Sequence, residues 1–400
     1  MHAVKLSLKI VLCTLIVLIL IVAAYVLYVV LNYERIPDDT ALDVGYSSNP
    51  LSSAGSDSES GWVLETGKEY KALTFNIGFG AYDRDFSFFM DEGVLSDGAT
   101  VVGSMSRAAS RKAVERSTAS VIGTALAEDP DITIFQEVDT DADRSHRVNQ
   151  TETILNAYLS AYLEQSLSSG RSLLENLDYY TYAKNFHTAY LFYPPTKPIG
   201  FIKDSGLLTV SRYRIDSAVR RSYPVSDAFP TKFFDLDRCF VVNRMPVQGA
   251  DGIRGELVFI NTHMSAYDKG GTIRRAQMEL LAEIIEGEYK AGNWVIVGGD
   301  FNHALGGSEY LFNHSMGIPP WVQPFDESFV PDGFTMLSPD NLAEVATVRD
   351  TSIPYERGYN FEVVLDGFMI SDNISATTHN IDADYDGSDH NPVLMKFTLK

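Results

Sequence analysis

The feature that most constrains this chain is a set of short apolar segments, rich in β-branched residues, that end abruptly at polar side chains. In the clearest one, Val295–Val297 is followed by two glycines and then by Asp300 and Asn302. Such a run is typical of a buried strand, and the glycines permit a sharp turn or the close approach of a ligand. Side chains two residues apart on a strand end point to the same side. A carboxylate and an amide aimed together suit a metal-bound water and a phosphoryl oxygen, whereas the structural alternative is an Asx turn.

Segments of the same kind recur along the chain, and helical patterns lie between some of them. Strands are predicted over residues 71–78, 131–138, 206–213, 232–245, 256–264, 363–371 and 393–399. Helices are predicted over 106–127 and 150–170, and another opens at 270 with Thr272 as its cap. Asp139, Asp141 and Asp143 are expected in a solvated acidic loop. Because hairpin-like strand pairs alternate with strand–helix units, the order predicts one α/β domain of stacked sheets with outer helices.

Polar residues lie in or directly after these apolar segments. They are Asn76, Glu137, His263, Asp300, Asn302, Asp366, Asp389 and His390. Taken singly, most have a structural explanation, such as a satisfied core histidine or a turn. Asp366 is harder to explain in this way, because it interrupts an apolar strand and a buried carboxylate needs a partner. Together, the histidines and carboxylates at separate strand ends predict one site assembled along one rim.

The chemistry of this set favours a divalent ion bound by oxygen. Hard donors suit Mg²⁺, with Mn²⁺ or Ca²⁺ as alternatives, better than zinc, and Glu137 and Asp389 are the expected ligands. Asp300 is expected to accept a proton from an attacking water. His263 and His390 are expected to donate to the developing pentacovalent oxygens, with a carboxylate such as Asp366 orienting one imidazole. No Gly-x-Ser-x-Gly motif occurs, so an activated serine nucleophile is not indicated.

Six short motifs, taken in order, resemble those of the endonuclease/exonuclease/phosphatase superfamily. That superfamily includes pancreatic-type deoxyribonucleases, abasic-site endonucleases, neutral sphingomyelinases and inositol-polyphosphate 5-phosphatases. The motifs cover about residues 70–400 and are Asn76-Ile, Gln136-Glu137, Thr262-His263, Gly299-Asp300-Phe-Asn302, Leu365-Asp366 and Ser388-Asp389-His390-Asn-Pro. The resemblance implies an α/β (α+β) fold, a four-layer sandwich of two packed, mainly antiparallel β-sheets flanked by helices. It also implies direct, Mg²⁺-dependent attack of water on a phosphoester.

Carried over by position, the resemblance implies a set of metal contacts. Glu137 corresponds to the metal-binding glutamate, and Asn76 lies beside the metal and the scissile phosphate. Asp389 resembles a second acidic residue near the metal. The abasic-site endonucleases carry an acid two residues after the first asparagine, a position that is Gly78 here and offers no side-chain ligand.

The remaining positions imply the reacting groups. Asp300 resembles the residue that orients or deprotonates water, and Asn302 resembles its phosphate-binding neighbour. His390 resembles the catalytic histidine, with Asp366 as its carboxylate partner. His263 matches the histidine found at this strand end in the deoxyribonuclease and sphingomyelinase branches, and we expect it to take part in both catalysis and substrate binding.

Substrate contacts are expected from Asn76, Asn302, His263 and Arg212. Arg212 ends the segment 206–212, which resembles the family's strand preceding a substrate-side loop. Sequence-independent binding of nucleic acid needs a basic stripe, and the formal net charge of −21 argues against one.

The N-terminal segment has a different character. Residues 10–31 contain no charged side chain, a span long enough to cross a bilayer as a helix. Lys5 and Lys9 precede it, which predicts an N-terminus inside the cell and a domain outside the cytoplasm. A cleaved signal peptide is the alternative, but the run ends in bulky residues rather than at a small-x-small site. The expected organisation is a cytoplasmic stub and transmembrane anchor over 1–34, a linker over 35–69 and a catalytic domain over 70–400.

The substrate is less constrained than the chemistry. An acidic domain tethered outside the cell membrane, with aromatic segments at 86–89 and 179–193, favours a phospholipid headgroup or another small phosphodiester. Packing in the core explains these aromatic residues equally well. An extracytoplasmic nuclease and a phosphomonoesterase are the alternatives. A nuclease needs a basic groove, and the best cluster for one is Arg212, Arg214, Arg220 and Arg221. A catalytically inactive binding domain is the non-enzymatic alternative, and nothing in the sequence indicates a protein partner.

Overall fold

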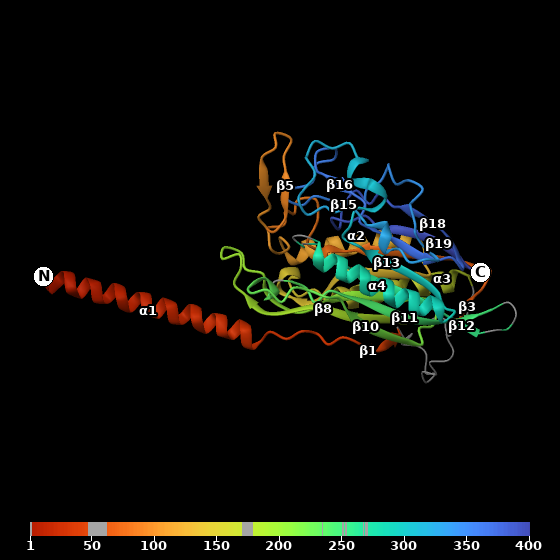
Figure 1. Ribbon diagram of the computed structural model, residues 1–400, viewed down its shortest axis with the longest axis horizontal. Helices are drawn as coiled ribbons and strands as arrows, with labels where there is room; N and C mark the ends of the chain where they lie inside the picture. Colours follow the sequence, from red (N-terminus) through yellow and green to blue (C-terminus); the bar gives the residue numbers. More distant parts are fainter. Residues whose placement is uncertain are drawn as a thin grey trace.

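The computed structural model describes residues 2–46, 62–169, 179–233, 235–249, 252, 254–266, 268 and 271–400. A long N-terminal helix, α1 (His2–Leu31), projects from a mixed α/β body (Figure 1). Over Lys5–Leu31 this helix is long and apolar enough to cross a membrane, by length and composition.

The larger of the two main sheets has eight strands in the order β1–β10–β11–β12–β13–β17–β14, with β3 beside β11. Its strands are β1 (Thr40–Leu42), β3 (Leu64–Glu65), β10 (Ser217–Ser222), β11 (Cys239–Gln248), β12 (Arg254–His263), β13 (Trp294–Asp300), β14 (Phe334–Met336) and β17 (Asp366–Ser371). The β3–β11 and β12–β13 pairs are parallel, and the remaining pairs are antiparallel.

The second sheet has seven strands in the order β18–β19–β4–β7–β9–β8–β2. Its strands are β2 (Val44–Tyr46), β4 (Glu69–Asn76), β7 (Ile132–Ala142), β8 (Tyr179–Leu191), β9 (Gly200–Ser211), β18 (Ile374–Asn380) and β19 (Val393–Leu399). Here the β4–β7 pair is parallel and the others are antiparallel.

Smaller elements complete the described chain. Two short hairpins pair β5 (Glu92–Val94) with β6 (Thr100–Val102), and β15 (Val348–Arg349) with β16 (Glu362–Val363). The 3-10 helices are η1 (Gly78–Gly80), η2 (Asp143–Ser145), η3 (Thr231–Phe233), η4 (Leu305–Tyr310) and η5 (Glu327–Phe329).

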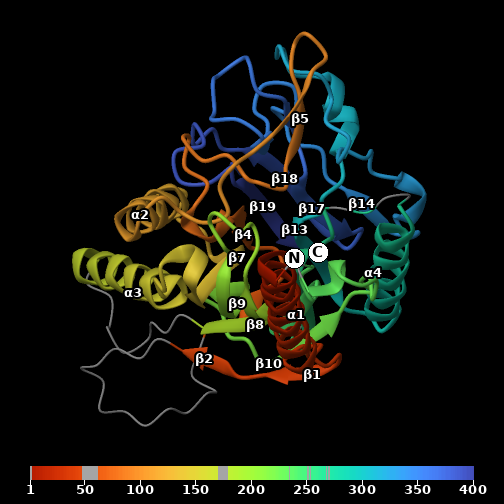
Figure 2. The same ribbon diagram turned by 90° about the vertical axis from the view of Figure 1, so that its left-hand side faces the viewer.

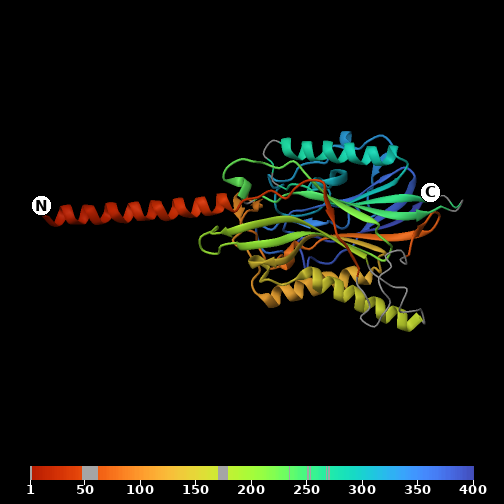
Figure 3. The same ribbon diagram turned by 90° about the horizontal axis from the view of Figure 1, so that it is seen from below.

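Helices cover the outer face of each sheet, and the sheets pack face to face (Figure 3). Ile134 and Ile296 belong to the apolar cluster between the sheets. Leu281 of α4 (Thr272–Lys290) packs in the cluster outside the eight-stranded sheet, together with Val297. Val121 of α2 (Arg111–Ala127) belongs to the cluster outside the seven-stranded sheet, which α3 (Gln150–Ser169) also covers. Because successive strand residues face opposite sides, Ile296 and Val297 fill different cores. The predicted four-layer sandwich of mainly antiparallel sheets is confirmed.

Part of the segment expected as a linker belongs to the sheets. β1 pairs with β10 and β2 pairs with β8, so residues 40–46 extend one edge of each sheet. An edge strand presents unpaired backbone groups that any adjacent extended segment can satisfy, so strand pairing here does not require a strongly apolar sequence. Residues 47–61 of the expected linker lie outside the described residues.

Local details near the helix ends also differ from expectation. The α2 helix begins at Arg111, because the Ser110 hydroxyl accepts from the Ala113 N–H at 3.1 Å and caps it. Thr272 does not cap α4, since the Asp268 carboxylate accepts from the N–H groups of the second and third helical residues at 2.7 and 2.9 Å.

The acidic run after Glu137 is not a solvated loop. Strand β7 continues to Ala142, and Asp139 is fully buried in it. The Arg144 guanidinium donates to both Asp139 oxygens, at 2.9 and 3.0 Å, and lies 3.8 Å from the centre of the Phe79 ring. A buried carboxylate needs such a partner, and this pair holds the end of β7 against η1.

Gly299 shows how tightly the strand end is built. Its φ is +146°, and an added Cβ would lie 2.0 Å from the carbonyl oxygen of Thr262. We expect Gly299→Ala to destabilise the protein by about 3 kcal/mol, through backbone strain and overpacking. The matched control is Gly287→Ala in α4, where an added Cβ meets nothing within 4 Å and the substitution is expected to stabilise by about 0.5–1 kcal/mol. Thermal melting of the purified full chain measures both, and equal melting temperatures for the two variants would contradict the assignment of strain.

Candidate active site

Strand direction brings the predicted polar residues to one edge of the sandwich. β4, β12 and β13 finish at this end of the sandwich, β7 passes it at Glu137, and the antiparallel strand β17 begins there. Asn76 at the end of β4 links the two sheets, because its amide donates to Asp300 of β13 at 3.1 Å and reaches Glu137 at 3.5 Å. Its own oxygen accepts from the Gly78 N–H at 3.1 Å. A site expected from separate strand ends is therefore one connected cluster.

The eight-stranded sheet contributes a row of neighbouring side chains. His263, Asp300 and Asp366 are direct cross-strand partners on β12, β13 and β17. All three are buried, and His263 Nε2 lies 3.4 Å from Asp300 Oδ2. Burial, followed by the charge of Asp366, raises the pKa of Asp300 to about 7, although His390 acts in the opposite direction. A carboxyl group with such a pKa can accept a proton near neutral pH.

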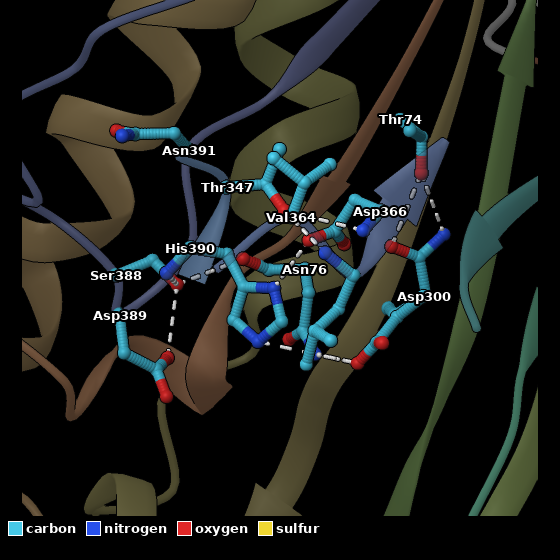
Figure 4. Close-up of polar contacts among 12 residues, drawn as sticks. Thr74, Asn76, Asp300, Thr347, Val364, Asp366, Ser388, Asp389, His390 and Asn391 are labelled. Atoms are coloured by element: carbon cyan, nitrogen blue, oxygen red, sulfur yellow. Dashed lines mark hydrogen bonds and ion pairs between the residues drawn. The ribbon is translucent and has the colours of Figure 1, made fainter. Parts of the chain in front are cut away.

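His390 and Asp366 form a hydrogen-bonded pair, as the sequence predicts. His390 Nδ1 lies 2.9 Å from Asp366 Oδ2, and His390 Nε2 lies 4.0 Å from Asp300 Oδ2 (Figure 4). Burial alone would lower the pKa of His390, but the carboxylates of Asp366, Asp389 and Asp300 outweigh it and raise the pKa to about 10. The imidazole is thus held as a cation, with Nε2 facing the centre of the site.

Asn302 supports Asp300. Its N–H donates to Asp300 Oδ1 at 2.8 Å, and its amide nitrogen donates to Asp300 Oδ2 at 3.1 Å and to the Met264 carbonyl at 2.8 Å. The residue has a φ of +50°, a left-handed conformation that asparagine tolerates better than most residues. The amide nitrogen therefore holds Asp300 in place, and the substrate contact expected of Asn302 remains a prediction for its side-chain oxygen.

Glu137 and Asp389 form the second part of the site, beside Asn76. Glu137 sits at a register shift of β7 with a φ of +56°, and its side chain is 21% exposed. A bulge of this kind re-aims a side chain out of the regular strand. Asp389 approaches Gly78, where an added Cβ would lie 3.0 Å from its Oδ1. Burial raises the pKa of Asp389 to about 6, with a contribution from the charge of Glu137 and against the lowering effect of His390.

This donor set fits the divalent cation that the sequence predicts. Two carboxylates whose charges act on each other are the hard oxygen ligands that Mg²⁺ prefers, and the Asn76 oxygen retains a second lone pair. Asp300, Asp366 and His390 form a competing group, with ligand atoms within 4.8 Å of one another. Asp366 Oδ1 there is buried and has no hydrogen-bond partner among the described residues. We favour Glu137 and Asp389, because a metal on His390 would displace the proton that the surrounding carboxylates hold there.

Arg238 is a site residue that the sequence reasoning missed. It is buried, directly precedes β11, and its Nη1 donates to His263 Nε2. Burial, together with the charges of Arg238 and His390, lowers the pKa of His263 well below its usual value. His263 is therefore neutral, and in this arrangement its Nε2 accepts from Arg238 and has no hydrogen to donate to a phosphoryl oxygen. The available signal was an arginine placed directly before a buried apolar run, Cys239–Val242.

Arg212 does not lie at the site. It follows the last residue of β9, which runs antiparallel to β7, and its N–H donates to the carbonyl of Asp131 at the start of β7. Ser211, the residue before Arg212, pairs with Ile132 of β7. Glu137 lies five residues further along β7 than Ile132, which is a distance of about 16 Å along the strand. The Arg212 side chain pairs with Asp129 and faces a cavity of about 590 Å³ at the opposite end of the sandwich. The expected substrate contact is wrong for this residue.

Residues 73–390 match the sequence profile of the Endonuclease/Exonuclease/phosphatase family. No curated protein matches the chain. Among solved structures, a truncated TDP2 from Caenorhabditis elegans is similar, with 14% identity and a TM-score of 0.43 over 83% of this chain and 99% of that one. A family protein from Leptotrichia buccalis has 13% identity and a TM-score of 0.47, over 83% and 99%. The 2',3'-cyclic phosphatase ANGEL2, in complex with adenosine-2',3'-vanadate, has 16% identity and a TM-score of 0.45, over 83% and 96%.

Proposed function

The chain belongs to the endonuclease/exonuclease/phosphatase family, and we propose that it hydrolyses a phosphodiester of a membrane lipid headgroup with Mg²⁺. Members of this family are phosphoester hydrolases that generally depend on a divalent metal. The observation that carries the hydrolytic part is the two-part site. A buried Asp366–His390–Asp300 array lies beside the Glu137–Asp389 carboxylates, so proton-transfer groups and metal ligands face one space. An attacking water and a phosphoryl group fit between such groups.

The proposed reaction is a direct attack of water on phosphorus. Asp300, held by Asn76 and Asn302, takes the proton of the attacking water as the new P–O bond forms. His390 donates from Nε2 to a phosphoryl oxygen as charge builds on it, and Asp366 keeps the imidazole oriented. The bond to the leaving oxygen breaks, and that oxygen takes a proton from solvent. Bound by Glu137 and Asp389, a divalent ion supplies charge neutralisation to the phosphoryl group.

Charge and topology support a lipid rather than a nucleic acid. The net charge is −21, and the arginines considered for a DNA groove already have partners. Arg212 pairs with Asp129, Arg214 with Asp216 and Arg221 with Asp38, while Arg220 is buried against backbone carbonyls. The apolar segment Lys5–Leu31, with Lys5 and Lys9 at its start, supports a single-pass anchor that leaves the catalytic domain outside the cytoplasm.

A product analysis tests the proposal. The full chain, reconstituted with Mg²⁺, is incubated with sphingomyelin, phosphatidylcholine, an inositol phosphate and plasmid DNA, and the products are identified by phosphorus NMR. We expect phosphocholine from the protein and none from the matched Asp300→Ala variant. Nucleotide products would replace the proposal with a nuclease, and inorganic phosphate would replace it with a phosphomonoesterase. A spectrum without products from either protein would overturn the catalytic assignment in favour of a binding domain.

A further inference from the structure

The active-site end of the sandwich is also the end from which α1 projects. The residues of β4 run from Glu69, beside Thr398 near the C-terminus, to Asn76 in the site. Figure 1 shows the C-terminus and α1 at opposite ends of the body, and Figure 2 views the body from the end at which α1 projects. If α1 crosses a bilayer, the end of the sandwich that carries the active site faces that bilayer.

Helix α1 is attached to the hairpin of β8 and β9. The Tyr25 hydroxyl donates to the Tyr190 carbonyl at 3.1 Å and accepts from the Phe192 N–H at 2.8 Å. The Tyr28 hydroxyl accepts from the Tyr190 N–H at 3.5 Å. Tyr25 and Tyr28 lie six and three residues before the end of the helix at Leu31, which places them about 9 and 4.5 Å inside its end. The uncharged run from Ile10 to Leu31 measures about 33 Å, close to the thickness of a hydrocarbon core. If the uncharged run fills the hydrocarbon core, these bonds hold the hairpin tip within about 9 Å of its outer boundary.

Large apolar side chains are exposed at this depth and around it. Phe192 is 55% exposed and Tyr193 is 48% exposed at the hairpin tip, and Phe229 is 66% exposed. The Phe229 ring contacts Phe233, with ring centres 5.6 Å apart, and Phe233 contacts Tyr33 at 5.1 Å, two residues after the end of α1.

The hairpin tip also meets the aromatic loop at 86–90. The Tyr193 ring lies 5.6 Å from the Phe89 ring, and Met90 beside it is 41% exposed. Exposed aromatic and apolar side chains next to a membrane-spanning helix match the composition of interfacial anchors.

We propose that Phe192, Tyr193, Phe229 and Met90 form a membrane rim that inserts into the same bilayer as α1 and turns the active site toward the lipid surface. The membrane rim rests on the proposed function, because it names the lipid surface on which the proposed active site acts. The occupant is the bilayer itself, since α1 is bonded to the hairpin tip and the rim continues from the helix end. Lys197 and Lys232 add positive charge to the same two segments, and the Lys232 ammonium lies 4.8 Å from the centre of the Tyr33 ring.

The rim also defines how a lipid reaches the site. Gly206 of β9 pairs with Val138 of β7 on one side and with Lys184 of β8 on the other. Lys184 therefore marks the position along β8 that is level with Glu137, the neighbour of Val138. The strand continues seven residues from Lys184 to Leu191, so the tip lies at most about 23 Å beyond the level of Lys184. The half-buried Phe89 ring packs against the apolar cluster that includes Leu191 of this hairpin, and the Phe88 ring meets it edge to face with ring centres 5.0 Å apart. We expect a lipid headgroup to reach the site along these rings.

A fluorescence experiment tests insertion without reference to activity. The full chain is reconstituted in vesicles of phosphatidylcholine brominated near the headgroup end of the acyl chains, and Phe192→Trp and Phe229→Trp are compared with Glu69→Trp. Glu69 is exposed at the opposite end of β4. We expect loss of the added fluorescence at positions 192 and 229 and none at 69, after subtraction of the wild-type signal. Equal fluorescence at all three positions would overturn the membrane rim.

An activity comparison separates failure of the rim from failure of the proposed function. The Phe192→Ser/Phe229→Ser double variant is expected to hydrolyse vesicle phospholipid about tenfold more slowly, because two apolar side chains no longer insert. Its hydrolysis of the soluble diester bis(p-nitrophenyl) phosphate is expected to match wild type, which also shows that the variant folds. Unchanged hydrolysis of vesicle lipid would overturn the rim while leaving the enzyme intact. Wild-type protein that cleaves neither substrate would overturn the proposed function, and the quenching result would still decide the rim.

Discussion

Replacing Asp300 with asparagine is expected to lower kcat for phosphodiester hydrolysis by about 10³-fold, within the range for loss of a general base. The amide keeps an oxygen for the Asn302 N–H, so the local backbone bond survives. The asparagine amide cannot take up a proton. The buried Asp300 carboxylate can, because burial and the charge of Asp366 raise its pKa to about 7. Steady-state kinetics on bis(p-nitrophenyl) phosphate measures the effect.

The control for this substitution is Asp340→Asn, on an acid whose side chain is 70% exposed and which pairs with His379 outside the site. We expect wild-type kcat for the control and similar melting temperatures for both variants. If Asp300→Asn retains more than about a tenth of wild-type kcat, another group accepts the proton from water.

We expect removal of the divalent metal to abolish hydrolysis. In the Glu137→Gln variant, we expect added metal to restore hydrolysis only poorly. Glu137 and Asp389 supply the charged oxygen donors that fit such an ion, and a neutral amide at 137 removes one charge from the pair. We expect Glu137→Gln to weaken Mn²⁺ binding by at least about 10²-fold. Calorimetric titration of the EDTA-treated protein with Mn²⁺ gives the affinity independently of activity, and added Mg²⁺ is expected to restore the wild-type rate.

Two further variants make the metal assignment specific. Glu344→Gln changes an exposed acid outside the site and is expected to leave Mn²⁺ affinity unchanged. Asp366→Asn is expected to lower kcat, because His390 loses its orienting carboxylate, while Mn²⁺ affinity stays at the wild-type value. A large loss of Mn²⁺ affinity in Asp366→Asn but not in Glu137→Gln would instead place the ion at the Asp300, Asp366 and His390 group.

The fold class and the central site residues were predictable because their signals are local. A β-branched run followed by a polar residue identifies a buried strand and its end, which is how Asn76, Asp300 and Asp366 were found. The hydrogen bond between Asp366 and His390 confirms one predicted pairing, and the four-layer arrangement confirms the predicted architecture. Helix ends were less accurate, because a cap depends on one side chain such as Ser110.

The sequence by itself determined which residues occupy strand ends, and it determined the apolar N-terminal helix. Only the tertiary structure decided which strand ends meet, because a strand-like pattern carries no information on direction. Arg212 follows β9 and Arg238 precedes β11, yet antiparallel pairing places the first far from the site and the second inside it. Long-range pairing likewise converted residues 40–46 into edge strands and joined Tyr25 of α1 to the β8–β9 hairpin. The contacts of residues 40–46 and of Tyr25 join residues more than a hundred positions apart, where local periodicity has no reach.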